Sequence, residues 1–338
     1  MPSKDIYILG IETSCDETCA SVVANGREML SNIVYSQIPL HEIYGGVVPE
    51  IAGRAHTEKI DIVVEEALKQ SDVPLEKIDA IAVTQGPGLV GALLVGVSYA
   101  KGLAYATNKP LIAVNHIEAH ICANYITNPK LYPPFLCLVV SGGHSHIIYI
   151  DENNNYSLIG CTHDDAAGEA FDKAARVLGL GYPGGPKLDK LARRGDDSAL
   201  KLPTPKTQGE YDFSFSGLKT AFINALHNME QKGEKYEPAD MAASFQKAVV
   251  DSLVDKTMLA AKKLKPDKLL LAGGVSANSL LRERMQKECD NLGIELNMPM
   301  LSLCGDNAAM IASCAYGMYV KKEYAPLTLN ALPALRMF

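Results

Sequence analysis

The 338-residue sequence lacks several signals that would place it in a common class. Its eight cysteines include no Cys-x-x-Cys pair and stand mostly among apolar residues, which predicts reduced, buried thiols instead of a disulfide framework. The first residues lack the long apolar region and small-residue cleavage site of a secretory signal, so export is not expected. No tract is of low complexity or dense enough in charge to stay disordered, which excludes an unfolded chain.

A long uninterrupted apolar run is also missing. The most apolar stretch, residues 89–106, follows Gly86-Pro87-Gly88 and contains Ser98 and Lys101. These features are typical of a buried core helix and not of a membrane span. The sequence therefore predicts a cytoplasmic protein without membrane association.

The sequence has no excess of positive charge. Its net charge of -7 argues against nucleic-acid binding through bulk electrostatics. Residues 187–206 nevertheless carry six basic side chains against three acidic ones, namely Lys187, Lys190, Arg193, Arg194, Lys201 and Lys206 against Asp189, Asp196 and Asp197. Two interpretations stay open for this segment, a solvated face and a local nucleic-acid contact.

Three common nucleotide and hydrolase motifs are absent. The P-loop, the dinucleotide fingerprint and Gly-x-Ser-x-Gly do not occur, which disfavours common ATPases, Rossmann dehydrogenases and α/β hydrolases. Glycine turns at residues 140–144, 182–186 and 272–278 remain. Each turn is compatible with phosphate binding at a strand-to-helix junction or with a plain tight turn.

What the sequence does contain is a repeated strand-turn-strand pattern. Residues 6–11 and 19–24 are β-rich and flank a polar turn, and residues 135–140 and 146–150 repeat this arrangement around a glycine turn. Further strands are predicted at 78–84, 111–114 and 268–271, and helices at 56–69, 89–106, 168–178, 238–264 and 307–319. The alternation predicts an α/β protein of two similar lobes with a ligand cleft between them.

Two histidines, His116 and His120, lie four residues apart in a predicted helix. This spacing places both imidazoles on one helix face, where a single metal ion can bridge them, although core histidines are also common. Glu118 lies roughly 200° around the helix from His116, so it cannot act as the general base of a His-Glu-x-x-His protease. The pattern favours a metal site and disfavours peptide hydrolysis.

The best candidate for a third ligand is Asp306, which opens the predicted helix at 307–319. Two histidines and one carboxylate form a ligand set of catalytic metals with open positions. A plain N-cap aspartate is the alternative.

Carboxylates are dense in residues 164–173, where Asp165, Glu169 and Asp172 fall near one helix face. A Glu169–Lys173 pair on a solvated face is one interpretation. A face that binds hydroxyl or amine groups is the other.

Taken together, these motifs resemble the TsaD family in both type and order. The matching segments are residues 10–18, 44–50, 86–89, 116–120, 141–144, 164–173, 182–186, 212–219 and 273–278. The resemblance implies the actin-like ATPase fold of sugar kinases, heat-shock chaperones and actin, with two lobes of duplicated topology. We expect an N-terminal lobe of residues 1–112, completed by a helix at 307–325, and a lobe of residues 113–306 that carries the metal and nucleotide sites.

The resemblance also implies transfer of the threonylcarbamoyl group from threonylcarbamoyl-AMP to N6 of adenosine 37 in tRNAs that read ANN codons. It implies TsaB-like and TsaE-like partners. ATP or ADP, or Mg²⁺, would be further ligands of the cleft. A small-molecule kinase of the same fold and a non-catalytic nucleotide-dependent assembly protein remain alternatives, and a metal-dependent peptidase is disfavoured.

By the same resemblance, His116, His120 and Asp306 match the ligands of one Fe²⁺ or Zn²⁺ per subunit. The positions that match nucleotide or acyl-donor contacts are Val139, Val140, Ser141, Gly142, Gly143, Asp172, Gly185, Asp189 and Asn278. Glu12 stands where sugar kinases place an aspartate, which predicts a catalytic role near the phosphates or the incoming amine.

Overall fold

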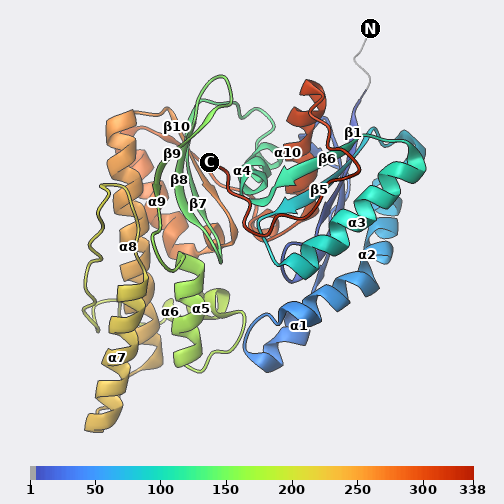
Figure 1. The fold of residues 1–338 in the computed structure, drawn as a ribbon. Coiled ribbons are helices and arrows are strands. Elements are labelled where there is room, and N and C mark those ends of the chain that lie inside the picture. The colour runs from blue at the N-terminus through green and yellow to red at the C-terminus, as the bar shows by residue number, and fades with distance from the viewer. Residues whose placement is uncertain (1–4) are drawn as a thin grey trace. The chain divides into compact units, whose positions relative to one another are not determined.

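The computed structural model describes residues 5–338, which form two compact units (Figure 1). Unit 1 contains the chain up to Leu131 together with Pro299–Phe338, and unit 2 is Tyr132–Met298. This division differs from the expected boundary after residue 112. The reason is that helix α4 (His116–Thr127) packs on helix α10 (Ala308–Lys321) in the core of unit 1, which brings the predicted metal ligands into that unit.

Unit 1 is built on a mixed sheet. In the described part of the chain its strand order is β3-β2-β1-β5-β6, with β4 paired to β2. The strands are β1 (Tyr7–Glu12), β2 (Glu17–Ala24), β3 (Glu28–Met29), β4 (Ile33–Ser36), β5 (Ala80–Gly86) and β6 (Leu111–Asn115). β1 and β2 are antiparallel, which confirms the predicted hairpin, whereas β1, β5 and β6 run parallel.

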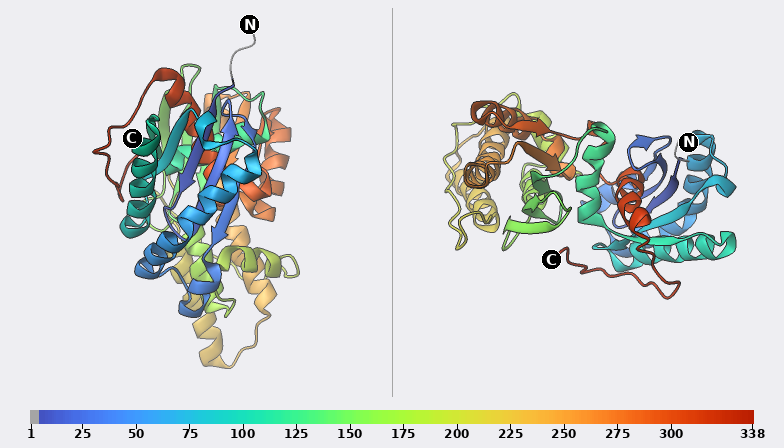
Figure 2. Two further views of the ribbon diagram at one scale, coloured as in Figure 1. Left: turned by 90° about the vertical axis from the view of Figure 1, so that its right-hand side faces the viewer. Right: turned by 90° about the horizontal axis from the view of Figure 1, so that it is seen from above.

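Both faces of this sheet are covered by helices. Leu9 and Ile11 of β1 face helices α2 (Pro49–Ser71) and α3 (Val90–Thr107), whereas Ile8 faces α4 and α10 (Figures 1 and 2). Successive residues of a strand point to opposite faces, so a strand with helices on both sides is apolar throughout. Within residues 5–338, α3 alone has the length and apolar composition required to span a membrane. Its Leu93, however, packs in the core of unit 1.

Gly10 lets α10 approach β1 closely. A methyl group on Gly10 would lie 2.8 Å from the backbone nitrogen of Ala312 and would also collide with the carbonyl oxygen of Ala308. Asp306 lies two residues before α10, and Glu12 lies two residues after Gly10. The close approach therefore helps to bring these two carboxylates together.

We expect Gly10→Ala to destabilise the protein by about 1–3 kcal/mol, because the added methyl group overpacks a strand-helix contact made of backbone atoms. Urea unfolding measures this change. The matched control is Gly102→Ala in α3, where an added methyl group meets open space. That variant should be more stable by about 0.5–1 kcal/mol. Equal effects of the two substitutions would contradict the packing explanation.

Unit 2 is built on a sheet of order β11-β10-β7-β8-β9. Its strands are β7 (Phe135–Val140), β8 (Ser145–Ile150), β9 (Tyr156–Cys161), β10 (Lys268–Ala272) and β11 (Glu295–Asn297). β7 and β8 are antiparallel, which confirms the second predicted hairpin. The helices of this unit are α5 (Ala167–Val177), α6 (Gly184–Ala192), α7 (Ser216–Lys232), α8 (Pro238–Leu264) and α9 (Ser279–Leu292). They contribute to one core with Leu136, Leu138 and Leu269 of the sheet.

Short elements complete the two units, and some helix bounds differ from those predicted. The short elements are α1 (Ile38–His41), η1 (Glu42–Tyr44), η2 (Leu75–Lys77), η3 (Gly274–Ala277) and η4 (Leu301–Leu303). α2 begins seven residues earlier than predicted, at Pro49, because proline is favoured in the first turn of a helix. α7 begins at Ser216, within the Asp212–Lys219 motif, and was not predicted from periodicity.

Asp164 fastens the loop before α5 to the start of α7. Its carboxylate accepts hydrogen bonds from Ser214 Oγ at 2.6 Å, the Phe215 amide at 2.8 Å, and the Ser216 amide and Oγ at 3.2 and 2.7 Å. Partial burial raises the pKa of Asp164. The hydrogen bonds from these donors lower it by more, so the pKa lies below its ordinary value of 3.8. The ionised form therefore stabilises the folded state.

We expect Asp164→Asn to lower the free energy of unfolding at neutral pH by about 1 kcal/mol, a modest value because the carboxylate is largely exposed. A depressed pKa gives stability that is present above 3.8 and is lost as the pH falls through the folded-state pKa. The gap between wild type and variant should accordingly shrink in acid. Urea unfolding at neutral and at acidic pH tests this, and Asp197→Asn is the exposed control. A difference in free energy of unfolding between wild type and Asp164→Asn that does not change with pH would refute the prediction.

Candidate metal centre

Helix α4 begins where β6 ends, and its first turn carries His116. The side chain of Asn115 is the N-cap and accepts hydrogen bonds from the amides of Ile117 at 2.9 Å and Glu118 at 3.3 Å. His116 and His120 then lie on successive turns with ring centroids 4.6 Å apart and planes at 80°. The predicted helical spacing thus brings the two imidazoles together.

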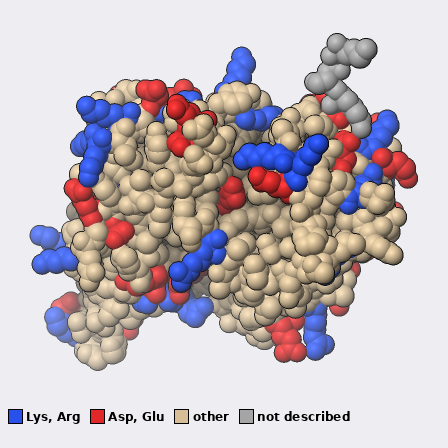
Figure 3. Space-filling model, turned by 45° about the horizontal axis from the view of Figure 1, so that its top comes forward, with Lys and Arg blue, Asp and Glu red and all other residues tan. Residues whose placement is uncertain are grey.

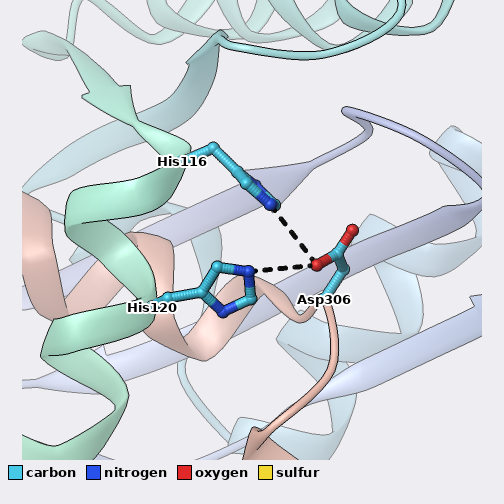
Figure 4. A group of neighbouring side chains, drawn as sticks. All are labelled: His116, His120 and Asp306. Atoms are coloured by element: carbon cyan, nitrogen blue, oxygen red, sulfur yellow. Dashed lines mark ion pairs between the residues drawn. The ribbon is translucent and has the colours of Figure 1, made fainter. Parts of the chain in front are cut away.

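Asp306 joins the histidines from the loop that precedes α10. The N-cap of that helix is Asn307, whose side chain accepts a hydrogen bond from the Met310 amide at 3.0 Å. The carboxylate of Asp306 is therefore not used as a cap. Figure 4 shows it pointing toward both histidines, with Oδ1 at 3.4 Å from His116 Nε2 and 3.3 Å from His120 Nε2.

His120 provides the test of whether these residues fit a metal ion. Its side chain is buried, and among the described residues neither ring nitrogen has a hydrogen-bond partner. The Nε2–Asp306 distance is that of an ion pair, but its geometry is not that of a hydrogen bond. Buried polar atoms without partners are costly, and a cation between the imidazoles and the carboxylate would satisfy them. The donor set fits a divalent metal.

The charges of the cluster also suit a cation. Burial lowers the pKa of His120, which favours the neutral imidazole, the form that ligates metals. Burial raises the pKa of Asp306, but the neighbouring His116 outweighs it and holds the pKa well below the usual range. Burial lowers the pKa of His116, whereas Asp306 and Glu12 raise it above its ordinary value. Because a metal ligates the neutral imidazole, a metal ion and a proton compete for His116.

Glu12 lies behind His116 and is completely buried. Its Oε2 is 3.0 Å from His116 Nδ1, and its carboxylate also accepts hydrogen bonds from Thr84 Oγ1 and the Ser14 amide. Ser14 Oγ is 3.3 Å from the same His116 nitrogen. The carboxylate of Glu12 thus orients the imidazole ring, in the way that carboxylates commonly hold metal-ligating histidines. Sequence reasoning missed Thr84 and Ser14, since a lone hydroxyl carries no spacing signal.

The glycine turn after β7 contains the next predicted site residues. Val139 and Val140 are buried strand residues, and Ser141, Gly142 and Gly143 form the turn. A side chain added at Gly142 or Gly143 would meet open space. Gly273 lies against this turn with φ +85°, and a side chain there would collide with Val140. Open space beside a glycine turn that follows a strand is compatible with an anion site.

The remaining predicted residues form two groups in unit 2. Asp172 Oδ1 accepts hydrogen bonds from the amides of Gly184 at 2.9 Å and Gly185 at 3.1 Å, at the start of α6. Asp189 and Asn278 form the second group, which Gln246 bridges. Gln246 Nε2 donates hydrogen bonds to Asp189 Oδ1 at 2.8 Å and to Asn278 Oδ1 at 3.1 Å. Gln246 was missed by sequence reasoning. The available signal was a glutamine in the apolar stretch of α8.

Comparison with known proteins gives the family. The sequence profile described as "TsaD: tRNA N6-adenosine threonylcarbamoyltransferase" matches residues 28–313. A protein of Clostridium botulinum with the name tRNA N6-adenosine threonylcarbamoyltransferase is 57% identical over 335 residues, which are 99% of this chain and 98% of that protein. A relative of the same name from Caldicellulosiruptor saccharolyticus is 55% identical over 332 residues, 98% of each chain.

Solved structures give the fold. Full-length HypF in its phosphate- and nucleotide-bound form is similar with a TM-score of 0.61 at 16% identity, over 95% of this chain and 47% of that one. Component A of the (R)-2-hydroxyglutaryl-CoA dehydratase of Acidaminococcus fermentans has a TM-score of 0.54 at 14% identity, over 93% and 99% of the two chains. These similarities confirm the predicted actin-like ATPase fold. By profile and by identity, the chain belongs to the TsaD family of tRNA N6-adenosine threonylcarbamoyltransferases.

Proposed function

We propose that this transferase moves the threonylcarbamoyl group from threonylcarbamoyl-AMP to N6 of adenosine 37 in tRNAs that read ANN codons, and that it uses one divalent metal ion. The family supports formation of the modified adenosine. The observation that carries the metal-dependent form of the proposal is the buried cluster of His116, His120 and Asp306, in which His120 has no hydrogen bond. Imidazole and carboxylate ligands suit both Fe²⁺ and Zn²⁺.

The proposed reaction divides the chemistry between the ion and the chain. The amine N6 forms a bond to the carbamoyl carbon and loses one proton to solvent, while the bond from that carbon to the phosphate oxygen breaks and AMP leaves as an anion. A bound ion at this centre would supply Lewis-acid stabilisation of negative charge on donor oxygens. Asp306 and the two imidazoles would hold the ion, and Glu12 would keep His116 in the ligating orientation.

The residues of unit 2 are proposed to bind the nucleotide part of the donor. The amides of Gly142 and Gly143 would donate to the phosphate, because both glycines follow a buried strand and have open space beside them. The adenosine part of the donor would contact Asp172, Gly185, Asp189 and Asn278. ATP or ADP with Mg²⁺ would bind at the same residues. A carboxylate oxygen has two lone pairs, so Asp172 and Asp189 can accept hydroxyl groups beside their present partners.

The partners are also part of the proposal. We propose tRNA as substrate, TsaB-like and TsaE-like proteins as members of a complex, and the cytoplasm as location. On the face shown in Figure 3, Lys and Arg side chains stand among Asp and Glu side chains. Residues 187–206 are the proposed tRNA contact in unit 2. Arg193, with 63% of its side chain exposed, pairs with Asp189 at 3.0 Å.

Mass spectrometry of tRNA nucleosides tests the function. The purified chain is incubated with tRNA, threonylcarbamoyl-AMP and the partner proteins, and threonylcarbamoyl-adenosine is expected. A chelator should abolish the product, and added Fe²⁺ or Zn²⁺ should restore it. No product under these conditions would refute the proposal. Transfer of γ-phosphate from labelled ATP to a metabolite would instead favour a kinase.

A further inference from the structure

A second cluster of metal-ligating side chains lies in unit 2. The Sγ atom of Cys161, a ring nitrogen of His163 and a carboxylate oxygen of Asp212 all lie within 4.8 Å of one another. Cys161 ends β9, His163 follows two residues later, and Asp212 lies on the segment before α7. The side chain of His163 is 55% exposed and that of Asp212 is 18% exposed. An ion from solvent can therefore reach the cluster.

The backbone holds the three residues in place without an ion. The Phe213 amide donates to the Cys161 carbonyl at 2.9 Å, and the His163 amide donates to the Phe213 carbonyl at 3.2 Å. The Cys161 amide donates to Asp212 Oδ1 at 3.1 Å, which leaves Oδ2 to face His163. Gly160 permits this approach, since a side chain there would collide with the backbone of Tyr211. Ligands fixed in advance lower the entropic cost of binding an ion.

The ligand types select a particular class of ion. One thiol, one imidazole and one carboxylate match the preferences of Zn²⁺, whereas Ca²⁺ and Mg²⁺ prefer oxygen ligands. His163 Nε2 lies 2.6 Å from Asp212 Oδ2 and donates a hydrogen bond to it. An incoming cation would displace the thiol proton into solvent and need no redox partner.

We propose that Cys161, His163 and Asp212 bind one zinc ion, with the fourth ligand position open to water. The ion would fasten the segment around Asp212 to β9, an edge strand of the unit 2 sheet. Exposed strand edges invite unwanted pairing, and the parallel bridge of Phe213 to Thr162 already covers part of this one. The site shares no residue with the first metal centre.

Cobalt binding tests the site, because Co²⁺ takes zinc positions and a thiolate ligand gives it a strong near-ultraviolet charge-transfer band. The probe is Co²⁺ added to the reduced full-length chain that carries His116→Ala and His120→Ala, in which the first centre is removed. A charge-transfer band is expected. Adding Cys161→Ser should abolish it, and adding Cys15→Ser should not. Cys15 is the matched control, since Cys15 and Cys161 are the half-buried cysteines among the residues that the structure describes.

Zinc content gives a second readout on proteins with the first centre intact. Wild type should bind two equivalents of Zn²⁺, and His163→Ala and Cys161→Ser should each bind one. Zinc should raise the melting temperature of the His116→Ala variant, and this rise should disappear when His163→Ala is added. If the doubly substituted chain does not fold, the band is compared between Cys161→Ser and Cys15→Ser in otherwise wild-type protein. The proposal would be overturned if the cobalt charge-transfer band persists after Cys161→Ser. It would also be overturned if the protein without Cys161→Ser shows no such band.

Discussion

Replacing His120 by alanine is expected to remove the metal ion from the first centre and to abolish threonylcarbamoyl transfer. Metal affinity should fall by at least about 100-fold, because loss even of an outer partner of a metal ligand costs about 10–100-fold. His120 is buried on α4, and its ring nitrogens have no hydrogen bonds among the described residues that could substitute for the ion. Metal analysis of the purified variant and mass spectrometry of tRNA nucleosides measure the two losses.

The matched control for His120→Ala is Glu118→Gln on the same helix. Glu118 is not part of the cluster around Asp306, so this variant should keep metal and transfer activity. The pair also separates transfer from peptide hydrolysis, in which a glutamate beside the histidines would serve as base. Circular dichroism verifies that α4 is intact in both variants. Full metal content and full activity of His120→Ala would eliminate the metal-dependent form of the proposal.

Substitution of Glu12 by glutamine is expected to weaken metal binding by about 10–100-fold while the protein stays folded. The carboxylate of Glu12 is buried against His116 Nδ1, Thr84 Oγ1 and the Ser14 amide. An amide of the same size keeps the shape but replaces one acceptor oxygen with a donor, so His116 loses its orienting partner. Glu12→Ala would be more damaging, since removal of one partner from a buried charged pair costs about 3–5 kcal/mol.

Two measurements distinguish the possible roles of Glu12. A positioning role predicts weaker metal binding in a competition titration, and transfer activity that recovers when excess metal is supplied. A direct role at the phosphates or the incoming amine, as the family resemblance suggested, predicts unchanged metal affinity and lost transfer. The position of its carboxylate at 3.0 Å from His116 favours the first role. Unchanged metal affinity in Glu12→Gln would therefore refute the positioning role.

Local pattern was sufficient wherever the spacing of residues fixed the geometry. The hairpins at β1–β2 and β7–β8 follow from apolar runs around short polar turns, and both were predicted. The helical period placed His116 and His120 on one face and Glu118 away from them. These features depend on neighbours within a few residues, which the sequence displays directly.

Contacts between distant segments could not be obtained in this way. Nothing in the spacing of Glu12 indicated that it supports His116, which lies 104 residues further along the chain. The contact needs β1 to lie beside β5 and β5 beside β6, which leads into His116. Thr84 of β5 binds the same carboxylate. The group of Cys161, His163 and Asp212 likewise forms because Phe213 pairs with the residues after β9.

By itself, the sequence determined the α/β class, the two hairpins, the histidine pair and the family to which the chain belongs, since each depends on local order of residue types. Only the tertiary structure decided that Asn307 caps α10 and leaves Asp306 free to face both histidines. It also decided that α4 belongs to the core of unit 1 and that Glu12 is a partner of His116. The physical reason is that buried charges and unpaired nitrogens are stabilised by atoms from remote segments, which only packing brings within hydrogen-bond distance.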